Sequence, residues 1–405
     1  MTEQAKVPAI RFAGFTDPWE QRKASEVFQI VDDRGHPTLP VLSATQNQGM
    51  IYRDDSGRYI GHDESNEIGY KRVLPGDFVV HLRSFQGGFA HSQYEGITSP
   101  AYTVFRAKEP TSHSDRFWKH WFMSEHFIAG LSTVTYGIRD GRSISVDEFM
   151  NTFLAFPAVE EQAAISRLFD YLDDLITLHQ RKYDKLVILK KSMLEKMFPK
   201  DGESVPEIRF AGFTDPWEQR KLSEVATFGG GHTPPMADPD NYEDGYVLWV
   251  TSQDVKSNYL DRTTTQITEK GAKELTLYPA GSLVMVTRSG ILRHTLPVAE
   301  LRKPSTVNQD IRVILPQGEC CGEWLLQFFI SHNKELLLEF GKTGTTVESV
   351  DFGKIKDMLL YMPSTVEQQQ IGDFFAKLDS LITLHQRKLE LLRNIKKSLL
   401  DKMFV

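Results

Sequence analysis

Two peptides each occur twice in this chain, and their order constrains the fold more than any other feature. The peptide IRFAGFTDPWEQRK stands at positions 10–23 and again at 208–221, and LITLHQRK stands at 175–182 and at 381–388. The chain therefore runs motif, variable region, helix, and then repeats that order. The copies of LITLHQRK are 206 positions apart and those of the longer motif 198, so the second variable region is longer. We expect two-fold internal symmetry.

Composition bounds the class of protein. A chain of 405 residues, 40% of them hydrophobic, can form two or three domains with their own cores. The first residues, MTEQAKVPAI, do not read as a signal peptide, and no apolar run is long enough for a membrane span, so we expect a cytoplasmic protein with no membrane partner. The adjacent Cys320 and Cys321 suit buried thiols better than a disulfide or a zinc site.

Charge gives a conflicting signal about nucleic acid. The net charge of −7 argues against a grip on phosphates, which needs clustered Lys and Arg. Basic residues do gather in 181–200, with seven against two acidic residues, and in 387–402, with six against two. The rest of the chain is therefore strongly acidic, and any DNA-binding hypothesis must account for it.

The variable regions, 24–156 and 222–362, share little sequence identity but have turns and prolines at corresponding places. Each has a Pro/Gly turn before a β-rich run ending in Arg-Ser, at 74–84 and 278–289. An aromatic-rich helical patch follows (117–131, 323–340), and each region closes at a proline, Pro157 or Pro363. We expect two α+β domains of one fold. The domain boundaries that we predict are 1–158, 159–200, 201–364 and 365–405.

Apolar residues at alternating spacings of three and four follow each proline and predict two long helices forming an antiparallel coiled coil. Each helix, from about 159 to 198 in the first copy, would span ~60 Å at ~1.5 Å per residue. His179 and His385 would meet near the symmetry axis as a polar pair that sets register, in preference to a catalytic or metal role. The seam residues that we predict are Ile165, Leu168, Leu172, Leu175, His179, Leu186, Leu189, Met193, Ile371, Phe374, Leu378, Leu381, His385, Leu392, Ile395 and Leu399.

The short link after the first helix places the second long motif just beyond that helix. By symmetry, the first motif should lie beyond Phe404 at the end of the second helix, with the N-terminus beside the C-terminus. We interpret Trp19 and Trp217 as anchors that pack each motif on its domain, and a ligand-binding role is the alternative.

The sequence shows no catalytic constellation, cofactor site or metal site. Gly341-Lys342-Thr343 resembles the end of a phosphate-binding loop, but the first glycine is replaced by Leu336, and Gly229-Gly230-Gly231 lacks nucleotide-loop spacing. Base-edge contacts typically use Arg, Asn or Gln, each of which makes two parallel hydrogen bonds. The candidate DNA-binding residues are Gln46, Asn47, Gln48, Arg83, Gln86, Arg139, Arg142, Gln253, Lys256, Asn258, Arg288, Arg293, Asn308 and Gln309.

Over its whole length the pattern resembles the specificity (S) subunit of type I restriction–modification enzymes. Besides the repeats, FGGGHTPP and LWVTSQD in the second region carry the resemblance, and the first region has VFQIVDDRGHPTLPV in the matching place, which resembles a different domain subtype. A shared P-x-x-x-E-Q lead-in precedes both helices: Pro157, Glu161, Gln162 and Pro363, Glu367, Gln368.

The resemblance implies a non-catalytic subunit whose two target-recognition domains each read half of a bipartite asymmetric site in double-stranded DNA. It implies that the paired helices act as a spacer and dock methyltransferase (M) subunits. S-adenosylmethionine would then belong to the M subunits, and ATP and Mg²⁺ to restriction (R) subunits. Two alternatives stay open: a two-headed adaptor for proteins or peptides with a coiled-coil dimerisation device, and a stand-alone nuclease or methylase, against which the missing motifs argue.

Overall fold

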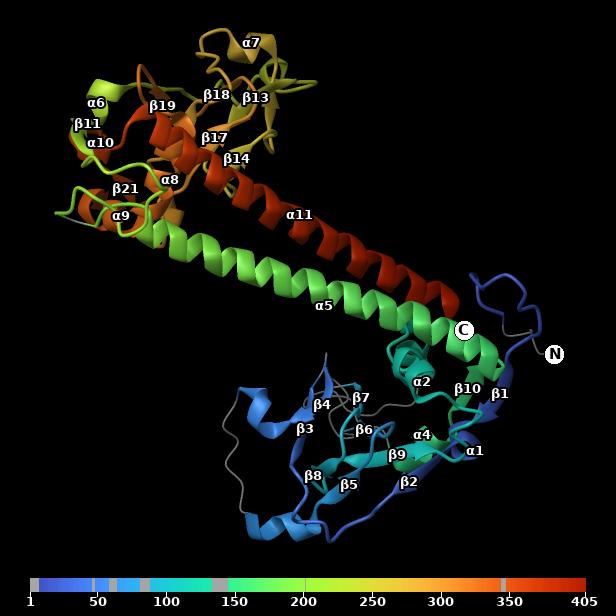
Figure 1. The fold of residues 1–405 in the computed structure, drawn as a ribbon. Coiled ribbons are helices and arrows are strands. Elements are labelled where there is room, and N and C mark those ends of the chain that lie inside the picture. Colours follow the sequence, from blue (N-terminus) through green and yellow to red (C-terminus); the bar gives the residue numbers. More distant parts are fainter. Residues whose placement is uncertain are drawn as a thin grey trace. The chain divides into compact units, whose positions relative to one another are not determined.

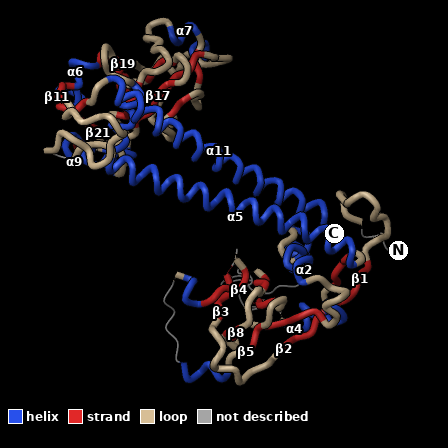
Figure 2. The backbone as a smooth tube through the Cα atoms, viewed as in Figure 1, coloured by secondary structure: helices blue, strands red, loops and turns tan. Residues whose placement is uncertain are grey.

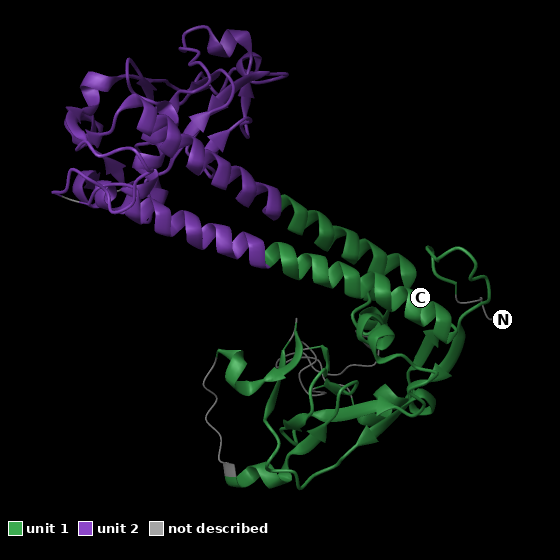
Figure 3. Ribbon diagram, viewed as in Figure 1, with its two compact units in different colours: residues 1–180, 387–405 green, residues 181–386 purple. Residues whose placement is uncertain are grey.

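The computed structural model describes residues 7–45, 48–57, 64–80, 88–132, 145–200, 202–343 and 347–405. They form two compact units (Figure 3): unit 1 is Met1–Gln180 with Arg387–Val405, and unit 2 is Arg181–Gln386. Both units mix helices and strands (Figure 2), as the predicted α+β class requires. None of the helices in these ranges is both long and apolar enough to cross a membrane.

The main sheets of the two units share one strand order. It is β2-β9-β6-β7 in unit 1 and β12-β19-β16-β17-β14 in unit 2. Neighbours among the first four strands are antiparallel in both sheets, and β14 pairs with β17 in parallel. The strands are β2 (Phe28–Val31), β9 (Thr103–Ala107), β6 (Phe78–Val80), β7 (Phe89–His91), β12 (Ala226–Gly230), β19 (Ile311–Pro316), β16 (Leu283–Val286), β17 (Val298–Leu301) and β14 (Tyr259–Leu260). This agreement is what two domains of one fold would produce.

Equivalent turns lead into the inner strands β6 and β16, as the Pro/Gly punctuation predicts. Gly76 and Gly281 have φ of 91° and 88°. This is the left-handed region, which glycine adopts without a steric penalty. The two domains therefore start the same strand with the same turn.

The smaller sheets differ between the units, so the domains have diverged outside the shared sheet. Unit 1 has the pairs β3-β4 and β5-β8, and unit 2 has β15-β13-β18 and β20-β21. These strands are β3 (Leu42–Thr45), β4 (Gly49–Tyr52), β5 (Lys71–Val73), β8 (Gly96–Thr98), β15 (Gln266–Ile267), β13 (Val247–Val250), β18 (Ser305–Val307), β20 (Gly341–Lys342) and β21 (Ser349–Val350).

Each aromatic-rich patch is helical, as the sequence predicts, and forms two helices. The patches fold as α2 (Asp115–Trp121) with α3 (Glu125–Ser132), and as α8 (Gly322–Ser331) with α9 (Asn333–Phe340). In unit 2 the break lies at His332, whose φ and ψ of −96° and 18° are not helical. The other short helices are α1 (Ala24–Val27), α4 (Val146–Asn151), α6 (Leu222–Val225), α7 (Glu269–Ala272), α10 (Phe352–Asp357), η1 (Arg53–Ser56), η2 (Glu64–Gly69), η4 (Pro239–Asn241) and η5 (Gly290–Arg293).

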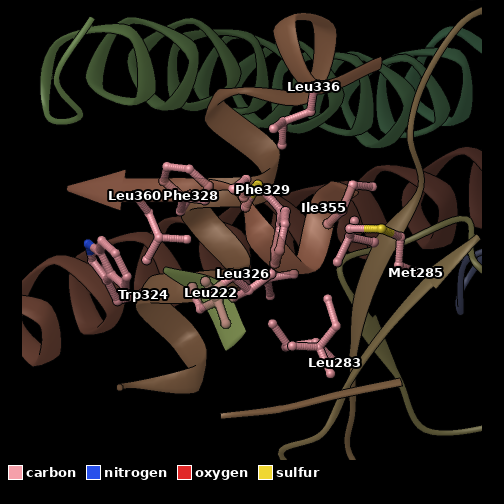
Figure 4. Packing of buried hydrophobic residues seen from close by; sticks show 14 of the residues in the cluster. Leu222, Leu283, Met285, Trp324, Leu326, Phe328, Phe329, Leu336, Ile355 and Leu360 are labelled. Carbon is pink, nitrogen blue, oxygen red and sulfur yellow. The ribbon is translucent and has the colours of Figure 1, made fainter. Parts of the chain in front are cut away.

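The largest core of unit 2 forms where α8 covers the main sheet (Figure 4). Leu283 and Met285 from β16 and Leu326 and Phe329 from α8 are fully buried. Burying an apolar side chain of this size stabilises the fold by ~1.5–3 kcal/mol. The alternation along β16 sends Val284 and Val286 to a second cluster on the opposite face, because successive strand residues point to opposite sides.

The repeated long motif builds the same contacts in both units. Its EQRK end forms β1 (Glu20–Lys23), antiparallel to β10 (Phe153–Phe156), and β11 (Glu218–Lys221), antiparallel to β22 (Leu359–Met362). The amide of Ile10 donates to the carbonyl of Lys402, and that of Ile208 donates to the carbonyl of Lys196, both at 2.9 Å. The prediction that the first motif lies at the end of the second helix is therefore confirmed within unit 1 (Figure 1).

Trp19 and Trp217 pack as the sequence predicts. They are 4% and 3% exposed. The Trp19 ring lies 6.3 Å from that of Phe404, and the Trp217 ring lies 6.2 Å from that of Phe198. Each tryptophan thus anchors its motif to the chain just after a long helix.

The long helices are α5 (Val159–Lys196) and α11 (Thr365–Met403), and the P-x-x-x-E-Q lead-in locks the start of each. Gln162 Nε2 donates to Pro157 O and Gln368 Nε2 to Pro363 O, both at 2.9 Å. The same amides accept from backbone N–H groups at the starts of α2 and α8, at 3.0 and 2.9 Å. Each glutamine therefore ties a long helix to its domain.

The glutamates that precede these two glutamines, Glu161 and Glu367, make buried ion pairs with arginines of the long motifs. Arg11 donates to Glu161, and Arg209 donates to Glu367, through Nε at 2.8 Å and Nη2 at 2.6 Å in each case. Glu161 and Glu367 are 2% and 1% exposed. Bidentate Arg–carboxylate pairs of this kind fix orientation as well as adding energy.

Within each unit, α5 and α11 run in opposite directions. In unit 1, Asp173 pairs with Lys396 at 2.5 Å, and further along α5, Gln180 pairs with Arg393 at 3.0 Å. In unit 2, Lys190 pairs with Asp379 at 2.6 Å, and the Phe198 ring then lies 6.2 Å from that of Phe375. As the residue number rises on one helix, it falls on the other.

The prediction of a buried position in the coiled-coil seam is wrong for two residues. Leu189 and Ile395 are 41% and 40% exposed, and the next residues, Lys190 and Lys396, turn inward in their place. The physical reason is that a helix of 3.6 residues per turn drifts by ~20° per heptad from a strict seven-residue repeat. The other predicted positions are buried or half-buried: Ile165, Leu168, Leu172, Leu175, His179, Leu186, Met193, Ile371, Phe374, Leu378, Leu381, His385, Leu392 and Leu399.

His179 belongs to unit 1 and His385 to unit 2. Their meeting at a symmetry axis therefore stays a prediction.

Replacing Glu367 by Gln should lower the free energy of unfolding by ~3 kcal/mol, because it leaves the Arg209 guanidinium buried without a counter-charge. A urea titration of the purified chain measures this. Glu218→Gln is the matched control, since the Glu218–Arg220 pair is exposed and worth under ~1 kcal/mol. Equal shifts of the two midpoints would contradict the structural role of Glu367.

Candidate nucleic-acid interface

Four loops of unit 2 meet at one edge of the domain. They follow β12, β13, β16 and β18 and comprise residues 231–236, 251–256, 287–294 and 308–310, which we call the loop edge. The amide of Asn308 donates to Val250 O at 3.0 Å, and that of Thr287 donates to Asp310 O at 2.8 Å. Thr233 Oγ1 donates to Gln309 Oε1 at 2.6 Å. Segments far apart in sequence therefore form one surface.

The glycine tract at the end of β12 serves close packing. A Cβ at Gly229 would lie 2.2 Å from Tyr278 Oη, and one at Gly231 would lie 1.9 Å from Val307 O. Tyr278 Oη also accepts from Gly230 N at 2.8 Å and donates to Gly230 O at 2.7 Å. Only glycine permits this approach, so the tract positions the loop edge.

Asp254 holds the loop that carries Gln253 and Lys256. Its carboxylate accepts four hydrogen bonds, from the amides and hydroxyls of Thr251 and Thr264, at 2.6 to 2.8 Å. Burial alone would raise the pKa of Asp254, but the bonds from Thr264 and Thr251 outweigh it and lower that pKa below 3.8. The ionised carboxylate is therefore the form that orders the loop.

Five of the candidate side chains are exposed on the loop edge: Gln253, Lys256, Arg288, Arg293 and Gln309. Arg288 forms a backbone bridge with Ser349, which fixes its position beside the loop. Arg293 pairs with Glu348, and this hydrogen bond lowers the pKa of the Glu348 carboxyl. The arginine charge is thus partly neutralised, although its side chain is 63% exposed.

Two candidates are not available for base contacts. Asn308 is 6% exposed; its Nδ2 donates to Asp310 Oδ2 at 3.3 Å, and its Oδ1 accepts from the amide of Asp310 at 3.1 Å. Asn258 donates to Asp379 of α11 at 3.0 Å. The prediction of base contacts is corrected for both, because side-chain amides satisfy buried polar groups within the fold as readily as they read bases.

Of the candidates in the first variable region, the structure describes Gln48. Gln48 is exposed, and its amide donates to Thr45 Oγ1 at 3.1 Å. The others lie outside the described residues: Gln46, Asn47, Arg83, Gln86, Arg139 and Arg142.

Three polar residues that sequence reasoning missed also stand at the loop edge of unit 2. His232 and His294 are exposed, and Arg312 is half-buried at the start of β19 beside Gly230. No sequence signal marks a lone histidine or arginine as part of an interface, since only the tertiary fold brings these residues to the edge.

Among the described side chains, one group has donor atoms close enough for a metal ion: His120, Asp170 and Asp173 in unit 1. Its carboxylates already face cations, with Lys119 Nζ at 3.4 Å from both and Lys396 Nζ at 2.5 Å from Asp173. Burial opposes ionisation of Asp170, but His120 and Lys119 lower its pKa to about 2. Two ammonium groups disfavour a divalent ion here, and the group is better explained as a charge network.

Comparisons with known proteins found a family model and several similar proteins. Residues 214–394 match the family model described as type I restriction modification DNA specificity domain. The specificity subunit of the type I restriction enzyme EcoR124I/EcoR124II from Escherichia coli is 30% identical over 166 residues, which cover 40% of this chain and 41% of that protein. The MjaIX specificity subunit from Methanocaldococcus jannaschii is 28% identical over 194 residues, 47% of this chain and 44% of that protein. The chain spans under half the length of these relatives.

The fold is shared over more of the chain. The S subunit of a type I restriction–modification system from M. genitalium matches with a TM-score of 0.66 over 98% of this chain and 99% of that one, at 12% identity. A structure from a study of complex assembly in the type I system matches with a TM-score of 0.51 over 96% and 99%, at 16% identity. At these identities the likeness shows the fold alone.

Replacing Asp254 by Asn should lower the free energy of unfolding by ~1–2 kcal/mol, because an amide cannot accept from all four threonine donors. For wild type, this contribution is present above pH 3.8 and is lost as pH falls through the lowered pKa of Asp254. Acid titration followed by circular dichroism tests both statements. Asp261→Asn is the control: its side chain is 62% exposed, and the free energy of unfolding should not change. An acid-titration curve of Asp254→Asn identical to that of wild type would exclude a stabilising role for Asp254.

Proposed function

We propose, from the premise that this chain has the fold of a type I restriction–modification S subunit and contains its DNA specificity domain, that it is the non-catalytic DNA-specificity subunit of such a system. Each recognition domain reads one half of a bipartite asymmetric site in double-stranded DNA. Methylation and cleavage belong to M and R subunits, which carry S-adenosylmethionine, ATP and Mg²⁺.

The observation that carries the proposal is one frame built twice with different surfaces. The main sheets share the order β2-β9-β6-β7 and β12-β19-β16-β17, and the identical motifs pair with β10 and β22 in the same register. The smaller sheets and the loop residues differ. A protein that reads two different half-sites needs two binding surfaces that differ from each other on a common scaffold. A symmetric adaptor would need two similar binding surfaces.

The long helices suit a spacer. Their 38 and 39 residues correspond to ~60 Å at ~1.5 Å per residue, under two turns of duplex at ~3.4 Å per base pair. The opposite directions of α5 and α11 within each unit support an antiparallel coiled coil between the domains. We assign residues 1–158 and 201–364 to the recognition domains, and 159–200 and 365–405 to the spacer.

The loop edge supplies suitable chemistry for base reading in the second domain. Arg288 and Arg293 can each make two hydrogen bonds to guanine, and Gln253 and Gln309 can do so to adenine. Lys256 suits a phosphate, because an ammonium acts as a point charge. In the first domain we propose Gln48 together with the candidates outside the described ranges.

The acidic balance of the chain fits a shared grip on DNA. With a net charge of −7, this chain alone would bind phosphates weakly. The M subunits would add basic surface, and the basic segments 181–200 and 387–402 would face them or the DNA.

Exchanging residues 24–156 for the equivalent region of another S subunit should change one half of the methylated motif and leave the other half intact. The reason is that β1 and β10, at the two ends of this region, rebuild the same frame. Genome-wide mapping of methylated adenine in cells that produce the M subunits measures both halves at once. A motif unchanged by the exchange, or no sequence-specific methylation by wild type, would favour the adaptor.

Inserting one heptad into each long helix, between positions 182 and 183 and between 388 and 389, should widen the gap between half-sites. Seven residues add ~10 Å at ~1.5 Å each, which is ~3 base pairs at ~3.4 Å. The same methylation map reports the gap. A heptad in α5 alone is the control, which should break the pairing and abolish methylation, and an unchanged gap in the double insertion would refute the spacer.

A further inference from the structure

One ion pair occurs twice on the long helices, buried in unit 2 and half-buried in unit 1. In unit 2, Lys190 Nζ lies 2.6 Å from Asp379 Oδ1. In unit 1, Lys396 Nζ lies 2.5 Å from Asp173 Oδ1, and both residues occupy the equivalent repeat positions. Lys190 and Asp379 are each 9% exposed. Removing two charges from water costs several kcal/mol per ion unless further hydrogen bonds satisfy them, so the remaining lone pairs of the carboxylate need partners.

In unit 2 the second recognition domain provides those partners. Asn258 Nδ2 donates to Asp379 Oδ2 at 3.0 Å, and Tyr259 Oη lies 3.5 Å from the same oxygen. The same hydroxyl donates to Glu323 Oε1 at 2.5 Å. The Asp379 carboxylate on α11 thereby joins α5 and β14, and Tyr259 links it to α8.

The contacts continue to the edge of the main sheet. The Arg302 guanidinium lies 4.1 Å from the centre of the Tyr259 ring, and its nitrogens reach Glu300 at 3.0 Å and Glu323 at 3.5 Å. Glu300 and Arg302 also pair through their backbone amides with Asn258 O and Leu260 O. We call Asp379 with Lys190, Asn258, Tyr259, Glu300, Arg302 and Glu323 the Asp379 cluster.

The charges of the Asp379 cluster do not balance. Three carboxylates, Asp379, Glu323 and Glu300, face the two cations Lys190 and Arg302, and Tyr259 is a neutral donor. Burial, with Glu323 adding to it, raises the pKa of Glu300 to about 7. The cluster therefore holds one extra proton below neutral pH.

In unit 1 a different set of side chains meets the same pair. Lys119 from α2 lies 3.4 Å from Asp173, and His120 and Asp170 extend the contacts. His120 is fully buried. The helix pair thus offers the same carboxylate twice, and each domain reaches it with its own residues.

We propose that Asp379 is a positioning residue: with Lys190 it forms a socket on the helix pair that receives Asn258 and Tyr259, and this contact sets how the second recognition domain is held and which gap length the protein accepts. The inference rests on the proposed function, because a gap exists only for a bipartite site. It also gives Asn258 a role in positioning the domain, in place of base reading.

The test compares Asp379→Asn with wild type in the full complex with M subunits. The substrates are DNA duplexes with both half-sites at the wild-type gap or at gaps one base pair shorter or longer, and the readout is methyl transfer from labelled S-adenosylmethionine. Losing a hydrogen-bonded charge weakens the positioning by roughly 1.4 kcal/mol or more. The preference for the wild-type gap should therefore fall about tenfold, and a merely destabilised protein would lose activity on all three duplexes alike.

Asp373→Asn is the matched control, because Asp373 lies on the same helix, is exposed and bonds Gln369. It should keep the wild-type preference. Tyr259→Phe removes a single hydroxyl. It replaces Asp379→Asn as the test variant if Asp379→Asn does not assemble with the M subunits. Unchanged gap preference in the assembled variant overturns the inference.

Hydrogen exchange separates failure of this inference from failure of the proposed function. In the complex without DNA, the amides of Glu300 and Arg302 should exchange faster in Asp379→Asn than in Asp373→Asn, whatever the complex reads. If these amides exchange faster in Asp379→Asn but the wild-type complex methylates no bipartite site, the proposed function is wrong and the socket is still supported. Equal exchange in the two variants overturns the socket.

A pH profile supplies a readout that a purely structural contact would not move. As pH rises from 6 to 8.5, Glu300 loses its proton beside Glu323, the two carboxylates repel, and gap preference should decline with a midpoint near 7. Glu300→Gln should make the profile flat over this range. A wild-type profile that matches that of Glu300→Gln contradicts the link between the protonation of Glu300 and the gap preference.

Discussion

Within each unit, the antiparallel packing of its part of α5 against its part of α11 is the constraint on which the rest of that unit depends. Because the helices run in opposite directions within each unit, the end of each lies beside the start of the other. The long motif that follows α5 therefore docks on the domain that precedes α11, and the motif at the N-terminus docks beside the end of α11. A parallel pair would leave both motifs without these partners.

Ionic contacts at the helix starts and along the seam then orient each domain. The Arg11–Glu161 and Arg209–Glu367 pairs are bidentate and buried. Apolar packing alone would supply comparable stability, since replacing buried ion pairs by well-packed hydrophobic residues is often neutral. What the ion pairs add is direction, because two parallel hydrogen bonds tolerate little rotation. That property matters in a protein whose proposed task is to hold two readers in a set relation.

The residues that shape the loop edge differ from those that we propose for recognition. The glycines of β12 and the carboxylate of Asp254 shape the loop edge through contacts within the domain, and the exposed Gln253, Arg288 and Gln309 are the residues for which we propose contact with DNA. Such a surface can change its exposed residues while the frame under it is kept. The two domains of this chain, with one sheet order and unlike smaller sheets, illustrate that outcome.

The sequence by itself determined the repeat order, the two long helices, the anchoring tryptophans and the place of the first motif beside Phe404. It could do so because exact repeats and apolar periodicity are local signals with a direct physical meaning. It misplaced Leu189 and Ile395, because helix drift accumulates over several heptads and let Lys190 and Lys396 turn inward. It also could not separate Asn258 and Asn308, which bond within the fold, from Gln253 and Gln309 on the surface. A side-chain amide has the same hydrogen-bonding groups in the interior and on the surface. Only the tertiary structure decides whether those groups already bond a residue of the same chain, as Asn258 bonds the carboxylate of Asp379.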